Sequence, residues 1–266
     1  MESQPSSNES SMEHDSSEQE FSLDFNDSNI LKVLSGIQFQ SWLTYQSRLP
    51  LHEHSIFSTR RATNVKAAIV FTDVVESTHL LYELGDYAYR NCLKNHFLRV
   101  RSLIKTSDGY EINSMGDGFL CIFANSINAI NFALGLQENT GDARVSVRVG
   151  IHWGEILTNS TEVGGKTIHF ASRVLNHASD ADICISDAVK QQLSVVLSRI
   201  EDTLIFLDED SKANTDVNEA NLDYLQALAT RLENGKRIQA LPWKEYPEST
   251  LKGIPGSHTL WQIGSA

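Results

Sequence analysis

Two aspartates lie in segments bounded by strongly apolar runs, where packing alone would favour a neutral side chain. Asp73 ends the run AAIVFTD, and Asp117 lies in the turn of SMGDGF. We expect the flanking apolar segments to be neighbouring strands, so that both carboxylates reach one edge of a sheet. Such a pair suits Mg²⁺ or Mn²⁺, which usually bind one or two carboxylates plus substrate phosphates. Taken singly, each aspartate has an ordinary explanation, because Asp-Gly is a standard turn and Thr-Asp a common helix cap.

The residues after Asp73 could hold phosphate groups. The segment VVESTHL leads into a helix, and free N–H groups at a helix N-terminus attract phosphate oxygens. Ser77 and Thr78 would add hydroxyl donors there. Further along, Arg173 in HFASRVLNHA and Lys252 in the LKG turn are cations that could stabilise charge on a transferring phosphoryl group. Singly, each of these residues is more often a cap or a solvated charge.

A scaffold of strands and helices must position these side chains. The run at Ala67 predicts a buried strand, and His79 to Ile104 predicts a long helix on which Tyr82, Tyr87 and Tyr89 pack against the sheet. The segment GYEINSMGDGFLCIF predicts a β-hairpin. The remaining expected elements are a helix from a Ser126 cap to about 137, a strand over ARVSVRVGIHWGEILT that bends at its glycines, a helix over 167–178, a strand over 182–186, a helix from 187 to about 197, and two short strands about a Pro-Gly turn near the C-terminal end. The order βαββαβαβ predicts an α/β fold, an α+β sandwich with a mixed, mainly antiparallel sheet and flanking helices.

Three regions differ in composition. Residues 1–27 are rich in Ser, Glu, Asp and Gln and are expected to be disordered. Residues 28–63 carry apolar side chains near helical spacing, which predicts an N-terminal helical segment. Residues 64–266 form the main domain, with an insertion at about 199–248 that contains an acidic linker and a helix over 218–233.

Bulk properties exclude several classes of protein. The 266 residues carry a formal net charge of -12, which argues against a general binder of nucleic acid or of an anionic membrane surface. Neither a signal sequence nor a run of about 20 apolar residues is visible, so a cytoplasmic location is expected. The cysteines Cys92, Cys121 and Cys184 lie in apolar surroundings without zinc-ligand spacing, which predicts reduced core thiols.

Five segments together resemble the class III adenylate and guanylate cyclase catalytic domain. They are FTDVVEST, GYEINSMGDGFLCIF, VRVGIHWGEI, IHFASRVLNHA and LKGIPG, and they occur in the family's order and approximate spacing. The similarity covers about Lys66 to Leu197 and resumes near Thr250. It implies a ferredoxin-like cyclase catalytic fold over 64–266 that closes a nucleoside triphosphate into its 3′,5′-cyclic monophosphate. It also implies a head-to-tail homodimer with active sites at the interface, each holding two Mg²⁺ or Mn²⁺ ions.

The resemblance assigns roles to individual residues. Asp73 and Asp117 would bind the metal ions, with the backbone carbonyl of Val74 assisting. Arg173 would stabilise the transition state, and Lys252 would contact the triphosphate.

The chain departs from the family where the base and ribose bind. Purine cyclases read the base with a Lys or Glu four residues before the second metal aspartate, and with an Asp, Thr or Cys seven residues before a helical Asn. Here these positions hold Asn113 and Glu162, and the helical Asn is replaced by His169, which either acts in catalysis or only fills the ribose position. The base end of the site is therefore altered, while the metal and phosphate residues are kept.

Three functional hypotheses follow. The favoured one is a pyrimidine cyclase that uses UTP or CTP, similar to bacterial enzymes that make cyclic UMP or cyclic CMP as an antiviral signal for a separate effector protein. An Asn amide offers both a donor and an acceptor, and His would shrink the pocket. The second is an adenylate cyclase with a divergent base pocket. The third is an inactive cyclase-like module that binds nucleotide or dimerises.

Overall fold

The computed structural model describes residues 63–158, 163–213, 219–246 and 249–264. The expectations for residues 1–27 and for nearly all of 28–63 lie outside this part of the chain. In chain order the elements are β1 (Thr63–Val74), α2 (Ser77–Thr106), β2 (Gly109–Met115), β3 (Gly118–Phe123), α3 (Ser126–Glu138), β4 (Val147–Thr158), β5 (Val163–Gly164), α4 (Lys166–Leu175), β6 (Ile183–Ser186), α5 (Asp187–Ala213), α6 (Glu219–Gln239), β7 (Trp243–Glu245), β8 (Ser249–Thr250), β9 (Ser257–His258) and β10 (Leu260–Ile263).

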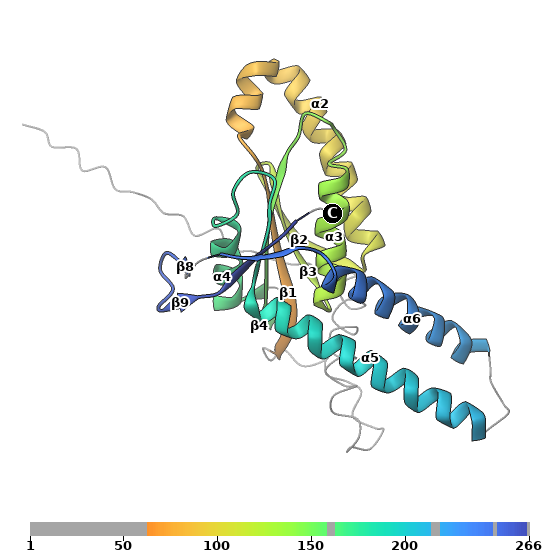
Figure 1. Cartoon of the computed structure of the whole chain (residues 1–266). Helices are drawn as coiled ribbons and strands as arrows, with labels where there is room; N and C mark the ends of the chain where they lie inside the picture. The colour runs from red at the N-terminus through yellow and green to blue at the C-terminus, as the bar shows by residue number, and fades with distance from the viewer. Residues whose placement is uncertain (1–62, 159–162, 214–218, 247–248, 265–266) are drawn as a thin grey trace, which may run out of the picture.

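One sheet organises the molecule. Its strands follow the order β2-β3-β1-β4-β6-β10-β7, with β5 paired to β4. Among these pairs only β4 and β6 run parallel. Helices α2 and α3 lie on one face of the sheet and α4 on the other (Figure 1). The predicted mixed, mainly antiparallel sheet with flanking helices is confirmed.

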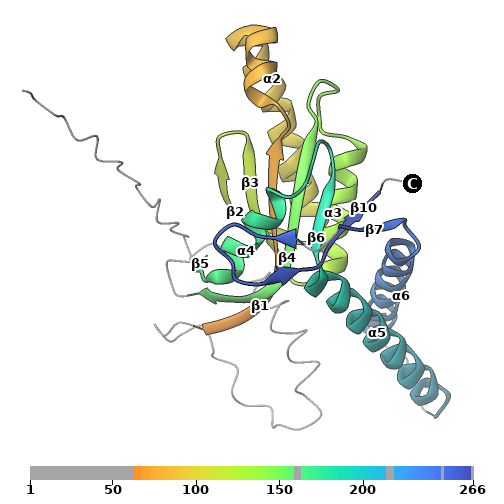
Figure 2. The same cartoon turned by 60° about the vertical axis from the view of Figure 1, so that its left-hand side comes forward.

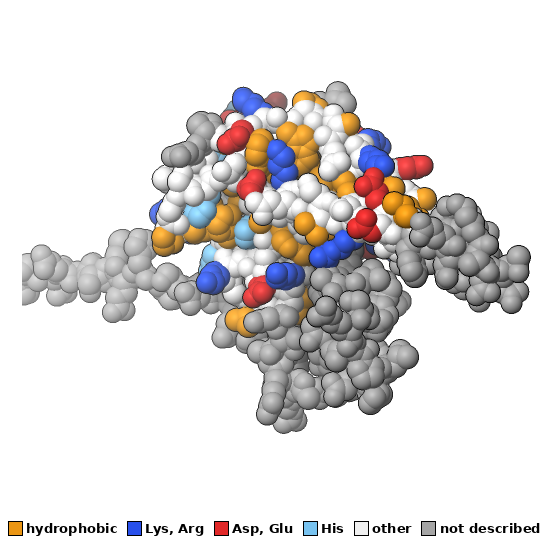
Figure 3. All heavy atoms as spheres, turned by 60° about the horizontal axis from the view of Figure 1, so that its bottom comes forward, with side chains coloured by type: hydrophobic (Ala, Val, Ile, Leu, Met, Phe, Trp, Pro, Cys, Tyr) orange, Lys and Arg blue, Asp and Glu red, His pale blue; other side chains and the backbone are white. Residues whose placement is uncertain are grey.

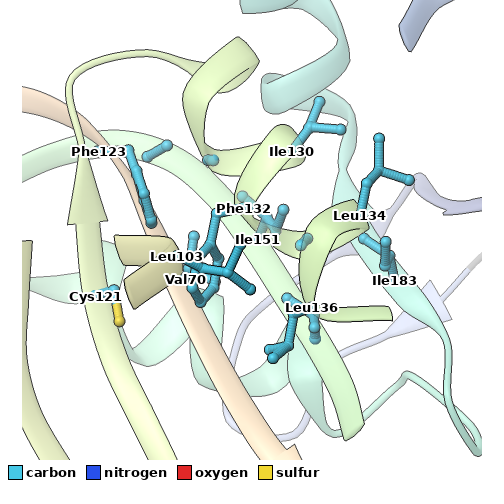
Figure 4. Close-up of a cluster of buried hydrophobic side chains, with 14 of the residues drawn as sticks. Val70, Leu103, Cys121, Phe123, Ile130, Phe132, Leu134, Leu136, Ile151 and Ile183 are labelled. Atoms are coloured by element: carbon cyan, nitrogen blue, oxygen red, sulfur yellow. The ribbon is translucent and has the colours of Figure 1, made fainter. Parts of the chain in front are cut away.

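The central strand β1 is buried on both faces, which explains its unbroken apolar run. Its even-numbered residues, such as Val70, pack under α2 and α3, while its odd-numbered residues, such as Ile69 and Phe71, pack on the α4 side. Figure 4 shows Val70 of β1 and Ile151 of β4 beside Leu103 of α2 and Phe132 of α3. The two cores fix which way each side chain of β1 points, Asp73 included.

Helices α5 and α6 correct the expected insertion. Helix α5 does not end near Leu197 but continues to Ala213, so part of the expected acidic linker is helical. Its sequence contains neither Gly nor Pro, and polar residues on its solvated side do not interrupt the helix. The buried residues Leu197 and Leu228 join α5 and α6 to the main core, and Lys236 pairs with Glu201 at 2.7 Å. Both views show the two helices extending beyond the sheet (Figures 1 and 2).

Smaller expectations also need correction. The cap of α3 is Asn125, whose side chain accepts a hydrogen bond from the Asn128 N–H, and Ser126 is the first helical residue. Strand β4 runs unbroken through its glycines because α4 packs directly on them: a Cβ at Gly150 would lie 2.3 Å from the Leu175 nitrogen. Helix α2 bends at Gly85, whose φ of 74° is outside the helical region.

Surface and thiol chemistry agree with the sequence. The three cysteines are free and buried. The face drawn in Figure 3 carries basic and acidic side chains near one another instead of a field of one sign. Within the described residues, no helix combines the length and apolar character needed to cross a bilayer.

Candidate active site

Asp73 and Asp117 come together where β1 ends and the β2–β3 hairpin turns. Strands β1 and β3 pair with Thr72 opposite Phe119, and the Phe119 N–H donates to the Thr72 hydroxyl at 3.1 Å. Gly118 allows the turn to lie very close to β1, since a Cβ at this position would lie only 2.3 Å from the Thr72 carbonyl oxygen. The two aspartates, separated by more than forty residues in sequence, therefore flank one point at the sheet edge.

The electrostatics of Asp73 reflect this crowding. Burial raises the pKa of the Asp73 carboxyl most strongly, and the charge of Asp117 together with a hydrogen bond between the two carboxyl groups raises it further. Hydrogen bonds from Arg148 oppose this shift, so that the net pKa of Asp73 stays above its ordinary value. Two carboxylates held this close repel each other, and a cation between them would relieve the repulsion.

The side chain of Arg148 was not identified from the sequence. It lies on β4 directly opposite Asp73, and its Nε and Nη2 donate to the Asp73 Oδ2 at 2.9 and 2.5 Å. Alternation along VRVGIHWGEI places Arg148 on the α4 side of the sheet. That alternation was readable from the sequence, whereas the register that sets Arg148 against Asp73 required the pairing of β1 with β4.

The backbone of Val74 and the start of α2 border the same point. The Val75 N–H donates to the carbonyl of Ser146, just before β4, and the carbonyl and N–H of one peptide point in opposite directions, so the Val74 carbonyl faces the side of the β2–β3 hairpin. Helix α2 begins after Glu76, which has a φ of 50° and makes no side-chain cap hydrogen bond within the described part of the chain. Ser77 and Thr78 thus form a first turn whose N–H groups are available to an anion.

A β-bulge decides which way Asn113 points. The register between β2 and β3 shifts between Glu111 and Asn113, so Glu111 lies opposite Cys121 while Asn113 lies opposite Leu120. Directly opposite residues share a face. Glu111 therefore faces α2, where Arg101 binds it at 2.8 and 2.9 Å, and Asn113 faces the α4 side like Asp73. Regular alternation would have placed Glu111 and Asn113 together.

The remaining predicted site residues form a second cluster around α4. Arg173 donates from Nε to the carbonyl oxygen of Lys252 at 2.9 Å, which ties α4 to the hairpin of β8 and β9. His169 is exposed on α4, and Glu162 lies outside the described residues. In both views the β8–β9 hairpin is separated from the junction of β1 and α2 that carries Asp73 (Figures 1 and 2). One chain therefore brings Asp73 and Asp117 together, and Arg173 and Lys252 together, in two separate places.

The tyrosines of α2 do not behave as expected. Tyr82 and Tyr87 are 84% and 83% exposed on either side of the Gly85 bend, so they do not pack against the sheet. Tyr89 is partly buried: burial raises the pKa of its hydroxyl, as do the charges of Asp117 and Asp73, while a hydrogen bond with Ser77 lowers it. Helical spacing alone could not reveal this arrangement, because the bend at Gly85 changes the direction of the helix.

The donors around Asp73 and Asp117 fit a divalent cation of the Mg²⁺ or Mn²⁺ type. Both carboxylates and the nearby Val74 carbonyl offer hard oxygen ligands. Among the described residues no group of three or more His, Cys, Asp or Glu side chains gathers as a metal site. A cation held here would therefore take its other ligands from water and from phosphate oxygens, as Mg²⁺ commonly does.

Comparison with known proteins defines the class. Residues 60–209 match the family model described as the adenylate and guanylate cyclase catalytic domain. The chain belongs to this family of nucleotidyl cyclase domains.

Individual relatives are distant. An adenylate cyclase from Podospora anserina is 26% identical over 224 residues, which cover 74% of this chain and 10% of the relative. A receptor-type guanylate cyclase from Caenorhabditis elegans is 26% identical over 148 residues, covering 47% of this chain and 13% of the relative. The chain thus spans about a tenth of the length of these curated relatives.

Solved structures share the fold. The adenylyl cyclase CyaB from P. aeruginosa superposes with a TM-score of 0.54 at 13% identity, covering 77% of this chain and 97% of that one. The catalytic core of a rhodopsin-guanylyl cyclase with converted specificity, in complex with ATPαS, gives a TM-score of 0.54 at 16% identity, covering 76% of this chain and 97% of that one. The class III cyclase catalytic fold predicted from the sequence is therefore confirmed.

Proposed function

We propose that this chain converts a nucleoside triphosphate into its 3′,5′-cyclic monophosphate and pyrophosphate, at an active site shared by two copies of the chain. The observation that carries this proposal is the placement of Asp73 and Asp117 at one sheet edge, where β1 pairs with β3 and Gly118 of the turn closely approaches the Thr72 carbonyl. Membership of the cyclase family supports the same reaction.

The reaction needs one bond made and one broken. The ribose 3′-oxygen attacks the α-phosphorus, the hydroxyl proton is released, and the bond from the α-phosphorus to the bridging oxygen breaks, so that the electron pair leaves with pyrophosphate. Two bound Mg²⁺ or Mn²⁺ ions would supply activation of the 3′-hydroxyl and neutralisation of phosphate charge. Asp73, Asp117 and the Val74 carbonyl hold these ions in our proposal.

The other residues act on the phosphates and on orientation. The N-terminus of α2, with Ser77 and Thr78, binds phosphate oxygens through N–H and hydroxyl donors. Arg173 stabilises the charge that develops in transfer, and Lys252 contacts the triphosphate. Because the cluster of Arg173 and Lys252 is separate from Asp73 within one chain, a second copy in head-to-tail arrangement supplies it.

For the base we propose a pyrimidine, so that UTP or CTP would give cyclic UMP or cyclic CMP for a separate effector in antiviral defence. The support is Asn113, which faces the same side of the sheet as Asp73 and presents both a donor and an acceptor to a base edge. His169 and Glu162 are the other two residues proposed to shape the base and ribose end. An adenylate cyclase is the competing function, favoured by the names of relatives such as the Podospora anserina protein.

A single experiment separates these functions. The purified full chain is incubated with each of the four nucleoside triphosphates and Mn²⁺, and the products are resolved by chromatography, with Asp73→Ala as the background control. Cyclic UMP or cyclic CMP is the expected main product. Efficient turnover of ATP alone would refute the pyrimidine assignment, and no product from any of the four would favour the inactive module.

A further inference from the structure

Arg148 and Asp73 form a half-buried ion pair within the proposed metal site. Two guanidinium nitrogens, Nε and Nη2, donate to the same carboxylate oxygen, Oδ2 of Asp73. The side chains are 32% and 29% exposed, so the pair is partly shielded from solvent. Shielding strengthens such a pair relative to one in water. The contact is therefore a substantial competitor for anything else that would bind this oxygen.

A divalent cation and the guanidinium of Arg148 cannot use Asp73 in the same way. Two N–H donors already occupy one of the two carboxylate oxygens, and the guanidinium charge would repel a cation a few ångströms away. Asp117, whose charge acts on Asp73, is left as the other carboxylate facing the cation. Metal binding through this oxygen of Asp73 therefore requires the ion pair with Arg148 to open.

We propose that Arg148 is a built-in competitor of the metal at Asp73, and that it makes metal binding depend on the triphosphate. A third of the Arg148 side chain is exposed, so it can leave Asp73, and a guanidinium pairs well with phosphate oxygens. An anion that draws Arg148 away frees Asp73 for the cation, and by linkage the cation increases affinity for the anion equally. This inference rests on the proposed function, because it assumes that Asp73 binds the metal.

The test measures Mn²⁺ binding directly, without turnover. Isothermal titration of Mn²⁺ into the full chain is performed with and without inorganic triphosphate, a probe that avoids the question of the base. The variants are Arg148→Gln, Arg148→Lys, Asp73→Asn and, as matched control, Arg144→Gln. Arg144 also pairs with an aspartate, Asp142 at 2.6 Å, but it lies in the loop before β4, so its loss removes the same charge elsewhere.

In the nucleotide-free protein, Arg148→Gln is expected to bind Mn²⁺ at least about 5-fold more tightly than the natural chain, the lower end of typical coupling factors. Triphosphate should then tighten Mn²⁺ binding by a smaller factor than it does in the natural chain and in Arg144→Gln, because only its direct coordination of the metal remains. Arg148→Lys keeps the charge but loses the paired donors, and should tighten binding by a smaller factor. Circular dichroism identifies any variant that fails to fold, in which case Arg148→Lys decides.

Two failures are distinguishable. If Asp73→Asn abolishes Mn²⁺ binding but the Arg148 variants bind no more tightly than the natural chain, the competition is refuted and the metal site stands. If Asp73→Asn leaves Mn²⁺ binding unchanged, the metal site itself is wrong and the proposed function fails with it.

Discussion

The charge of Asp117 lowers stability at a position where it could serve chemistry. Its charge raises the pKa of Asp73, which means that the two carboxylates repel each other in the metal-free protein. Nothing in the packing of the turn requires a charge at this position, because the close approach belongs to the neighbouring Gly118. This supports the proposal that the carboxylate of Asp117 serves to bind a cation.

Replacing Asp117 with Asn should therefore separate activity from stability. We expect cyclase turnover to fall by at least about 100-fold, since even outer-shell partners of metal sites are worth 10–100-fold. The melting temperature measured without metal should stay the same or rise, because the repulsion with Asp73 is removed. Asp86→Asn, which neutralises an exposed carboxylate on α2, is the matched control and should change neither quantity. A large loss of melting temperature in Asp117→Asn would mean that this residue is structural.

His152 makes stability depend on pH. Burial and the nearby His258 lower the pKa of the His152 imidazole to about 4, and its Nδ1 lies 2.7 Å from the Ser186 hydroxyl. The unfolded chain binds the proton near pH 6.5 and the native chain does not, so this stabilisation is complete above 6.5 and is lost as pH falls toward 4. We expect the free energy of unfolding to drop by about 2–3 kcal/mol over that interval from this group.

The measurement is urea unfolding at a series of pH values in the natural chain and in His152→Gln. The variant should be less stable at pH 7 and should show a shallower fall below pH 6.5. Equal slopes in the two proteins would show that another group, such as the buried His96 whose pKa is also lowered by burial, carries the dependence.

At the residue scale, the two aspartates could be located from the sequence because charged side chains beside apolar runs are conspicuous. Arg148 was missed because an arginine in an alternating strand is ordinary until the register sets it against Asp73. Tyr82 and Tyr87 were misplaced because they flank the bend of α2 at Gly85. In each case the sequence pattern does not show how two elements that are distant along the chain are placed against each other.

At the scale of elements, the β2–β3 hairpin positions Asp117 near Asp73. Its turn was predictable from the Gly-Asp-Gly sequence, since such short Gly-containing connections favour hairpins. The bulge before Asn113 was not predictable, because a bulge depends on how β3 fits against the neighbouring strand. The extension of α5 to Ala213 was missed for a different reason: its polar composition indicated a linker, although nothing in it breaks a helix.

Gly118→Ala tests the close approach of this hairpin. The added Cβ would lie 2.3 Å from the Thr72 carbonyl oxygen, so β3 must move away from β1 and carry Asp117 with it. We expect a loss of about 1–3 kcal/mol in the free energy of unfolding, typical of overpacking, together with a fall in turnover. Gly116→Asn is the control in the same turn, because Gly116 has a φ of 60° that Asn tolerates and open space around it. Urea unfolding and product assays on both variants check the expectation, which fails if both behave alike.

At the scale of the whole molecule, our proposal gives one chain two half-sites. The sheet edge carries Asp73 and Asp117, and the α4 side carries Arg173 and Lys252, whose contact at 2.9 Å ties the hairpin to the helix. The α4 side of the sheet keeps apolar side chains of β2 such as Tyr110 and Ile112 only partly buried, which suits a protein partner. The sequence implied this division only through family resemblance, because periodicity does not reveal which surfaces two copies share.

Mixing two inactive variants tests whether a second copy completes the site. Asp73→Asn lacks a residue of one half-site and Arg173→Ala a residue of the other, so each alone should be inactive. In a mixed dimer one of the two sites combines an intact Asp73 with an intact Arg173. Random exchange of equal amounts makes half of the dimers mixed, so activity should recover to about a quarter of the natural level per chain. Product assays measure the recovered activity, and analytical ultracentrifugation measures the dimer content. A mixture of Asp73→Asn and Asp117→Asn is the control. It cannot recover, because both changes lie in the same half-site. No recovery in the complementary mixture despite dimers would show that each chain carries its own complete site. Recovery in the control would show instead that Asp73 and Asp117 do not act in the same half-site.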